Sequence, residues 1–254
     1  MAEVWLMSEA AVEGGPVESR ATAAPATARR EPTDGLAELV RAFVERNVPF
    51  EWTPTRVHLS QEGEMQLKPG RWLRFTAEQE TASDRVQFAW RARFPIASRL
   101  ALGVNDWYAA DAGALEVRLL GLPLRRVRGH DVARGEAMRY LAELPWVPHA
   151  ALFNRELVWH DVDDRSVEVA TNVDGERVAV RLHFDDRGDI VAVAAPDRPR
   201  AVGRGVVPTP FSGGFTDYQH VGAVRLPTTA EVRWELPDGP FVYFRGRVTS
   251  YAAH

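Results

Sequence analysis

Turns rich in Asp and Gly, set between runs of alternating apolar and polar residues, constrain this chain most strongly. Four such turns are expected, at Asp111-Ala112-Gly113, Asp174-Gly175, Asp186-Arg187-Gly188-Asp189 and Asp238-Gly239. Asp and Gly supply the positive φ angles that tight hairpin turns need, and alternation with a period of two is typical of a strand with one buried face. The chain is therefore expected to fold largely into β-hairpins.

The strands that this alternation predicts belong to one sheet. In residues 86–94 one face carries Val86, Phe88, Trp90 and Phe94, and the other carries Gln87, Arg91 and Arg93. About eleven segments of this kind follow one another along the chain. We therefore predict a mainly β (α+β) fold, in which one large curved antiparallel sheet forms a half-open barrel.

The N-terminal part of the chain differs in composition. Residues 1–33 are rich in Ala, Pro, Thr and Glu without a sustained period, which predicts a disordered tail. A helix is expected over residues 34–47, with Thr33 or Asp34 as its cap. Residues 34–254 are expected to form a single half-barrel domain.

A second helical segment interrupts the strands in mid-chain. Residues 133–144 carry apolar side chains at helical spacing, Pro145 ends this helix, and a further helical turn extends through Leu152. A helix inserted between two halves of an antiparallel sheet can bury its apolar stripe against the concave face. We expect the helices within residues 133–152 to lie there.

The composition excludes several classes of function. The chain has 254 residues and no Cys, which rules out disulfides, thiolate metal sites, Cys nucleophiles and a lipid-modified Cys. Its formal net charge of −4 gives no general attraction to nucleic acid, and no run is long and apolar enough to span a bilayer. The first residues lack the features of a secretory signal, so a cytoplasmic location is expected.

Metal and cofactor sites are not predicted. The seven His residues show none of the short spacings that metal sites use, and no Gly-rich segment precedes a helix that would receive a phosphate. No motif of a catalytic nucleophile is present either.

Arg residues are concentrated between positions 118 and 139. They are Arg118, Arg125, Arg126, Arg128, Arg134 and Arg139. One interpretation is a cradle for an anionic head group or phosphate. The other, which we favour, is a sheet edge whose charges prevent pairing with another strand.

The sequence Asn-Asp-Trp-Tyr at residues 105–108 combines polar and aromatic side chains within one strand. Trp107 is in phase with a buried face, which places Asp106 and Tyr108 on the opposite face, where they would hydrogen-bond each other or a ligand. The aromatic residues expected near the inserted helix are Trp90, Trp107, Tyr140 and Trp146. Either core packing or an apolar pocket beneath the helix would account for them.

Six segments together resemble an uncharacterised bacterial family of unknown function. They are WRARF (90–94), DWY (106–108), RLLGLP (118–123), GEAMRYLAELPWVPHAAL (135–152), HFDDRGDI (183–190) and PTPFSGGFTDY (208–218). The pattern RYLAE-x-x-W-x-P is the most recognisable part, and the resemblance covers residues 50–250. The layout is also similar to the periplasmic lipoprotein carriers of the LolA/LolB-like class. That resemblance implies a half-open barrel with helices against its concave face and an apolar hollow that binds acyl chains.

We predict a protein that binds a lipid or another hydrophobic ligand in the concave pocket of the half-barrel. Apolar and aromatic side chains would line the pocket, and Arg118 or Arg139 would meet a polar head group. The candidate ligand-binding residues are Trp90, Phe94, Asp106, Trp107, Tyr108, Arg118, Met138, Arg139, Leu141 and Trp146. No catalytic residue is assigned.

Two other functions remain open from the sequence. A small-molecule hydrolase or isomerase would use Asp106, Tyr108, Glu136 and Arg139, and would require a carboxylate with a shifted pKa inside a pocket. A protein-interaction module would use a sheet edge or the Arg-rich face. Binding is favoured over catalysis, and the oligomeric state is not indicated.

Overall fold

The computed structural model describes residues 36–49, 53–97, 100–203 and 205–254. Within these residues the chain forms thirteen strands rather than about eleven, and few helices. The mainly β, antiparallel class predicted from the alternation is confirmed. The tail predicted for residues 1–33 and the caps Thr33 and Asp34 lie outside the described residues.

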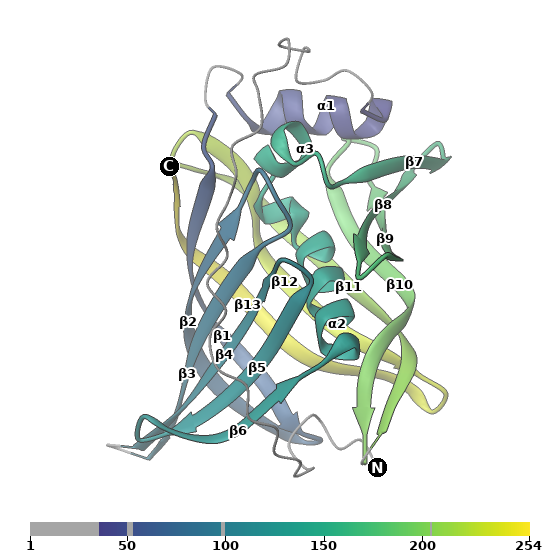
Figure 1. The fold of residues 1–254 in the computed structure, drawn as a ribbon. Coiled ribbons are helices and arrows are strands. Elements are labelled where there is room, and N and C mark those ends of the chain that lie inside the picture. The colour runs from purple at the N-terminus through teal and green to yellow at the C-terminus, as the bar shows by residue number, and fades with distance from the viewer. Residues whose placement is uncertain (1–35, 50–52, 98–99, 204) are drawn as a thin grey trace, which may run out of the picture.

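All strands of the described residues belong to one antiparallel sheet, in the order β6-β5-β4-β3-β2-β1-β13-β12-β11-β10-β9-β8-β7 (Figure 1). The first half comprises β1 (Arg56–Lys68), β2 (Arg71–Ala82), β3 (Phe88–Ala97), β4 (Leu100–Ala109), β5 (Ala112–Leu119) and β6 (Leu122–Arg128). The second half comprises β7 (Val158–Asp163), β8 (Ser166–Val173), β9 (Glu176–Phe184), β10 (Ile190–Val202), β11 (Gly205–Val221), β12 (Val224–Leu236) and β13 (Gly239–Ala253). Pairing of β1 with β13 joins the two halves and leaves β6 and β7 at the edges.

The sheet curls into a half-open barrel, and helix α2 (His130–Ala142) lies in its hollow (Figure 1). The helix connects the two edge strands along the chain. It contacts β4, β5 and β6 on one side and β8, β9 and β10 on the other. Nearly all of its turns are buried, as a helix enclosed by a sheet requires. The predicted position of the inserted helix against the concave face is confirmed.

The helix boundaries differ from those predicted. The inserted segment consists of α2, a single 3₁₀ turn η1 (Leu144–Trp146) and α3 (His149–Phe153). The α-helix ends at Ala142 rather than Leu144, because Pro145 has no N–H to donate and the chain tightens into the 3₁₀ turn. Helix α1 (Glu38–Asn47) begins later than residue 34, since Ala37 is extended, and it packs with α3 across one end of the barrel (Figure 1).

One turn lies at a different position from the one predicted, because the glycine expected in it is needed where α2 approaches the sheet. The turn expected at Asp111-Ala112-Gly113 lies at Ala110 and Asp111, whose φ angles are 49° and 61°. Gly113 belongs to β5, where an added Cβ would come within 2.9 Å of the Cα of Ala133. This glycine therefore permits the close approach of α2 to the sheet and does not form the turn.

Strand β4 presents the opposite face from the one predicted. Trp107 is half-buried on the outer face, whereas Asp106 and Tyr108 are buried on the inner face. The register explains this, because Asp106 lies opposite Trp90 and residues directly opposite in an antiparallel pair share a face. The prediction that Trp107 faces the core is therefore wrong: the register with β3 decides the face, and the size of the side chain does not.

Candidate functional site

A cavity of about 180 Å³ lies between α2 and the concave face of the sheet. Its walls come from strands β1, β3–β5 and β10–β13 and from α2 with the 3₁₀ turn. Most of the lining is apolar or aromatic, as in Met65, Leu102, Val117, Phe211, Val232 and Trp234. This is the hollow in which the sequence predicted a pocket, beneath the inserted helix.

One stripe of α2 and the residue after it faces the cavity. Its members recur at spacings of three and four, and they are Val132, Gly135, Glu136, Arg139, Ala142 and Glu143. Met138 and Leu141 lie on other faces of the helix and are fully buried in the core. The helix therefore packs its large apolar side chains into the core and directs three charged side chains toward the cavity.

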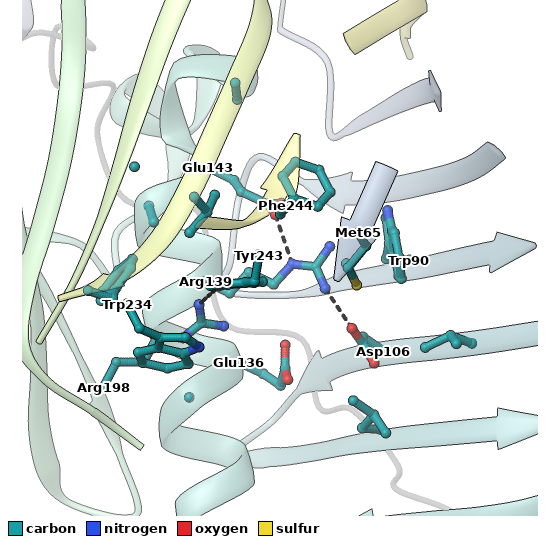
Figure 2. A pocket seen from close by; sticks show the side chains of 18 of the residues that line it. Met65, Trp90, Asp106, Glu136, Arg139, Glu143, Arg198, Trp234, Tyr243 and Phe244 are labelled. Carbon is teal, nitrogen blue, oxygen red and sulfur yellow. Dashed lines mark hydrogen bonds and ion pairs between the residues drawn. The ribbon is translucent and has the colours of Figure 1, made fainter. Parts of the chain in front are cut away.

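Arg139 lies at the centre of these charges (Figure 2). Its Nη1 donates to Oδ2 of Asp106 and its Nε donates to Oε1 of Glu143, each at 2.8 Å. Its Nη2 contacts Oε1 of Gln79 at 3.5 Å, and its Cζ lies 4.9 Å from the ring centroid of Trp90. Ion pairs, an amide and an aromatic face thus hold the guanidinium in place.

Two carboxyl oxygens at the cavity, Asp106 Oδ1 and Glu136 Oε2, have no hydrogen-bond partner among the described residues. Asp106 is 8% exposed and Glu136 is 9% exposed. Asp106 extends from β4 and Glu136 from α2 toward the same space (Figure 2). A buried acceptor without a donor costs free energy, so these two atoms form a pair of acceptors that a ligand can satisfy.

Arg198 of β10 supplies the second positive charge of the cavity. Its Nη1 donates to Oη of Tyr243 at 2.9 Å, and its Cζ lies 5.6 Å from the ring centroid of Trp234. Glu136 lies between Arg198 and Asp106 in Figure 2. Arg139 and Arg198 both favour the ionised forms of these two carboxyl groups and so lower their pKa values.

The balance of these charges determines where a proton resides. Three carboxyl groups (Asp106, Glu136, Glu143) face two guanidinium groups (Arg139, Arg198), so the cluster carries one negative charge when all five are ionised. Burial first, and then the charge of Asp106, raises the pKa of Glu136 from 4.5 to about 8. Burial also raises the pKa of Asp106, against the opposing effect of Arg139. The Asp106–Glu136 pair therefore binds a proton near neutral pH, and one proton brings the cluster to neutrality.

Four of the ten candidate ligand-binding residues line the cavity, namely Trp90, Asp106, Arg139 and Trp146. Three others are fully buried in the core, namely Phe94, Met138 and Leu141. Tyr108 is buried but does not line the cavity, and its Oη donates to Oδ1 of Asp111 at 3.2 Å. Trp107 lies on the outer face of the sheet.

Arg118 also lies outside the cavity. It is exposed, and its Nε pairs with Oε1 of Glu116 at 2.8 Å. Because Val117 faces the cavity, the alternation of β5 directs Arg118 to the outer face. Arg118 therefore cannot meet a head group inside the hollow. Three of the remaining Arg residues of the stretch lie on the edge strand β6; Arg126 and Arg128 are exposed there, whereas Nε and Nη1 of Arg125 are buried without a hydrogen-bond partner among the described residues.

Two charged residues of the cavity were not predicted. Glu143 follows Arg139 by four positions and Glu136 by seven, so helical spacing alone could have placed all three on one stripe. No such signal existed for Arg198, because an irregularity in register between Ala195 and Arg198 interrupts the alternation of β10.

Comparison with family models decides where the chain belongs. Residues 26–246 match a model described as a family of unknown function, DUF6544. The chain belongs to this family. The resemblance to an uncharacterised family, carried in part by RYLAE-x-x-W-x-P, is thereby confirmed. A search of curated proteins finds no match.

Two solved structures are similar to this DUF6544 protein. The LolA superfamily protein NE2245 from Nitrosomonas europaea has a TM-score of 0.46 and 10% identity over 85% of this chain and 92% of that chain. A beta-barrel-like protein of the domain of unknown function DUF1849 from Brucella abortus has a TM-score of 0.23 and 10% identity over 80% of this chain and 98% of that chain. The first belongs to the class that the sequence layout resembles. At these TM-scores and identities neither likeness supports an argument about function. The half-barrel fold is established by the order and pairing of the strands.

Two further observations concern the described residues alone. None of their helices is both long and apolar enough to cross a bilayer. Nor do they bring together three or more His, Cys, Asp or Glu side chains in a way that could hold a metal ion.

Proposed function

We propose that this DUF6544 protein binds a small hydrophobic molecule, or a section of an acyl chain, in the cavity between α2 and the sheet. The cavity is the observation that carries the proposal. It has a volume of about 180 Å³, and most of its walls are apolar or aromatic with a few polar groups among them, as is usual for small-molecule sites. Protein interiors are otherwise closely packed, so space of this kind beneath a buried helix favours a ligand over a packing defect.

The size and walls of the cavity define the apolar part of the ligand. An apolar cavity of about 150 Å³ in another protein takes up benzene. A cavity of about 180 Å³ therefore suits a ring or a short alkyl chain. Trp90, Trp146 and Trp234 would contact that group and would also report its arrival through their fluorescence.

Tryptophan fluorescence titrated with hexanol tests the proposal. We expect a saturable change in wild-type emission. Val232→Phe is expected to lower the affinity at least about tenfold, because the larger ring occupies space that Val232 leaves to the cavity. Val207→Phe is the matched control, since Val207 is 46% exposed and lies outside the cavity lining. Equal affinity in the two variants would contradict the proposal.

A second candidate function is acid–base catalysis on a small apolar substrate. It is favoured by Glu136, because a pKa raised to about 8 suits proton transfer near neutral pH. Tyr108 would take no part, because its hydroxyl is engaged with Asp111 away from the cavity. Purified protein assayed with a panel of small esters tests this function. If wild type turns over an ester and Glu136→Gln does not, while the variant still binds hexanol, the result would support catalysis. Equal turnover by wild type and Glu136→Gln would contradict it.

A further inference from the structure

The side chains of the cavity also indicate the polar group of the ligand, an inference that rests on the proposed binding function. We propose that the cavity selects an amine, whose ammonium group lies between Asp106 and Glu136 and whose apolar part lies against the aromatic wall. The two acceptors, the charge balance of the cavity and its poor fit to an anion support this proposal.

The two unpartnered oxygens form a hydrogen-bond acceptor site that is fixed by the fold. Asp106 Oδ1 and Glu136 Oε2 each belong to a residue more than nine-tenths buried, and both residues line the cavity. They come from different elements, β4 and α2, so the fold fixes their relative position (Figure 2). An ammonium group has three N–H donors and no acceptor, which matches a pair of acceptors better than a hydroxyl group with one donor.

The charge balance favours a cation. Among the described residues, the charged side chains that most affect the pKa of Glu136 are Asp106 on β4, Arg139 and Glu143 on the helical segment, and Arg198 on β10. This cluster has an excess of one negative charge, which a proton on Glu136 removes. A bound ammonium group supplies the same positive charge. Glu136 then releases its proton to solvent and pairs with the ligand, so the cavity holds either a proton or a cation.

An anionic head group is less suited to this cavity. Nε and Nη1 of Arg139 are engaged with Glu143 and Asp106, and Nη1 of Arg198 is engaged with Tyr243. Three carboxyl groups line the same space, and like charges in an interface are repelled. A carboxylate ligand would therefore add to the negative excess instead of relieving it.

Hexylamine, hexanol and hexanoate share one alkyl chain and differ only in the head group, so their affinities test the proposal. We would measure each by tryptophan fluorescence at about pH 6 and about pH 9, where an alkylamine with a pKa similar to that of Lys stays protonated. The ammonium group binds the ionised form of Glu136, whose pKa is about 8. The affinity for hexylamine should therefore rise about 100-fold between these two pH values. The affinity for hexanol should change little.

Two variants separate recognition from folding. Glu136→Gln resembles the protonated carboxyl in shape, and it should remove the pH dependence and weaken hexylamine binding at about pH 9 at least about tenfold. Its affinity for hexanol should change far less than its affinity for hexylamine, which distinguishes the loss of head-group recognition from a change in the cavity. Asp106→Asn, which keeps Glu136, should also weaken hexylamine binding at about pH 9, where Glu136 is ionised in both proteins. Glu45→Gln is the matched control, because Glu45 is an exposed carboxylate of α1 outside the cavity, and all its affinities should equal those of wild type.

The outcomes distinguish this proposal from the proposed function. Equal binding of hexylamine and hexanol at both pH values, or tightest binding of hexanoate, would overturn the selection of an amine and leave a hydrophobic binding site. Failure of all three compounds to bind would contradict the binding function itself.

Discussion

Two buried clusters of carboxylate and guanidinium groups in this half-barrel are built in different ways. The closed cluster consists of Asn47, Asp189 and Arg225. The cavity cluster consists of Asp106, Glu136, Arg139, Glu143 and Arg198. Both contain a carboxylate that solvent scarcely reaches, since Asp189 is 4% exposed and Asp106 is 8% exposed.

The closed cluster satisfies its carboxylate within the protein. Nη1 and Nη2 of Arg225 donate to Oδ1 and Oδ2 of Asp189 at 2.6 and 2.7 Å, and Nη1 also donates to Oδ1 of Asn47 at 3.0 Å. Nδ2 of Asn47 in turn donates to the carbonyl of Phe43 at 2.7 Å. The cluster thereby ties the end of α1 to β12 and to the turn before β10.

The cavity cluster leaves two carboxyl oxygens without a partner in the described part of the chain, and both residues border open space. The same residue types therefore have different roles in the two places. Where every charged oxygen has a donor, the cluster stabilises the fold. Where donors are missing beside a cavity, a ligand can supply them.

Asp189→Ala tests the closed cluster and should have the largest effect on stability. It leaves Arg225 without its carboxylate partner, and removing one member of a buried pair costs about 3–5 kcal/mol. Urea denaturation measures this loss, and the affinity for hexanol should not change. Asp186→Ala, in the same turn but with a side chain 79% exposed, should cost less than about 1 kcal/mol. Similar losses in both variants would contradict the role given to Asp189.

Glu136→Gln tests the cavity cluster through the pH dependence of stability. The folded protein keeps the proton of Glu136 up to about pH 8, whereas the unfolded chain loses it near 4.5. The free energy of unfolding of wild type should therefore fall relative to the variant as pH rises through this window, because the folded state binds the extra proton. The slope should be at most about 1.4 kcal/mol per pH unit, so the difference should grow by at most about 5 kcal/mol across the window. A difference that does not vary with pH would contradict the account.

Asp106→Asn should have the smallest effect on stability, about 1 kcal/mol or less, because the amide oxygen can still accept a hydrogen bond from Arg139. It should nevertheless lower the pKa of Glu136, since the charge of Asp106 is the largest cause of the raised pKa after burial. Carbon-13 NMR of the labelled Glu carboxyl group measures this pKa. The same pKa in wild type and variant would show that the two carboxyl groups are not coupled.

The features of the fold that depend on neighbouring residues could be predicted from the sequence. Alternation identified the strands, and Asp174-Gly175 forms a two-residue turn with φ angles of 50° and 83°, as such pairs favour. The spacing of apolar residues and Pro145 located the helical interruption. Each of these signals involves residues close together in the sequence, so it can be recognised without knowledge of the fold.

The candidate site was less predictable because it depends on how distant strands meet. The buried face of Asp106 follows from the register between β3 and β4, and a large neighbour at position 107 suggested the opposite face. Arg198 lies at the cavity next to an irregularity in the register of β10, and no local sequence pattern predicts that irregularity. Glu136 could be named from helical spacing, but its protonation depends on the charges that three separate elements bring together.

A crystal structure of the protein with hexylamine is the most direct test of the central claim, that the cavity cluster is left open for a ligand. We expect the alkyl chain in the cavity between α2 and the sheet, with the nitrogen within hydrogen-bond distance of Asp106 Oδ1 and Glu136 Oε2. Hexylamine bound only elsewhere on the protein, or water molecules on both oxygens with no ligand in the cavity, would contradict it.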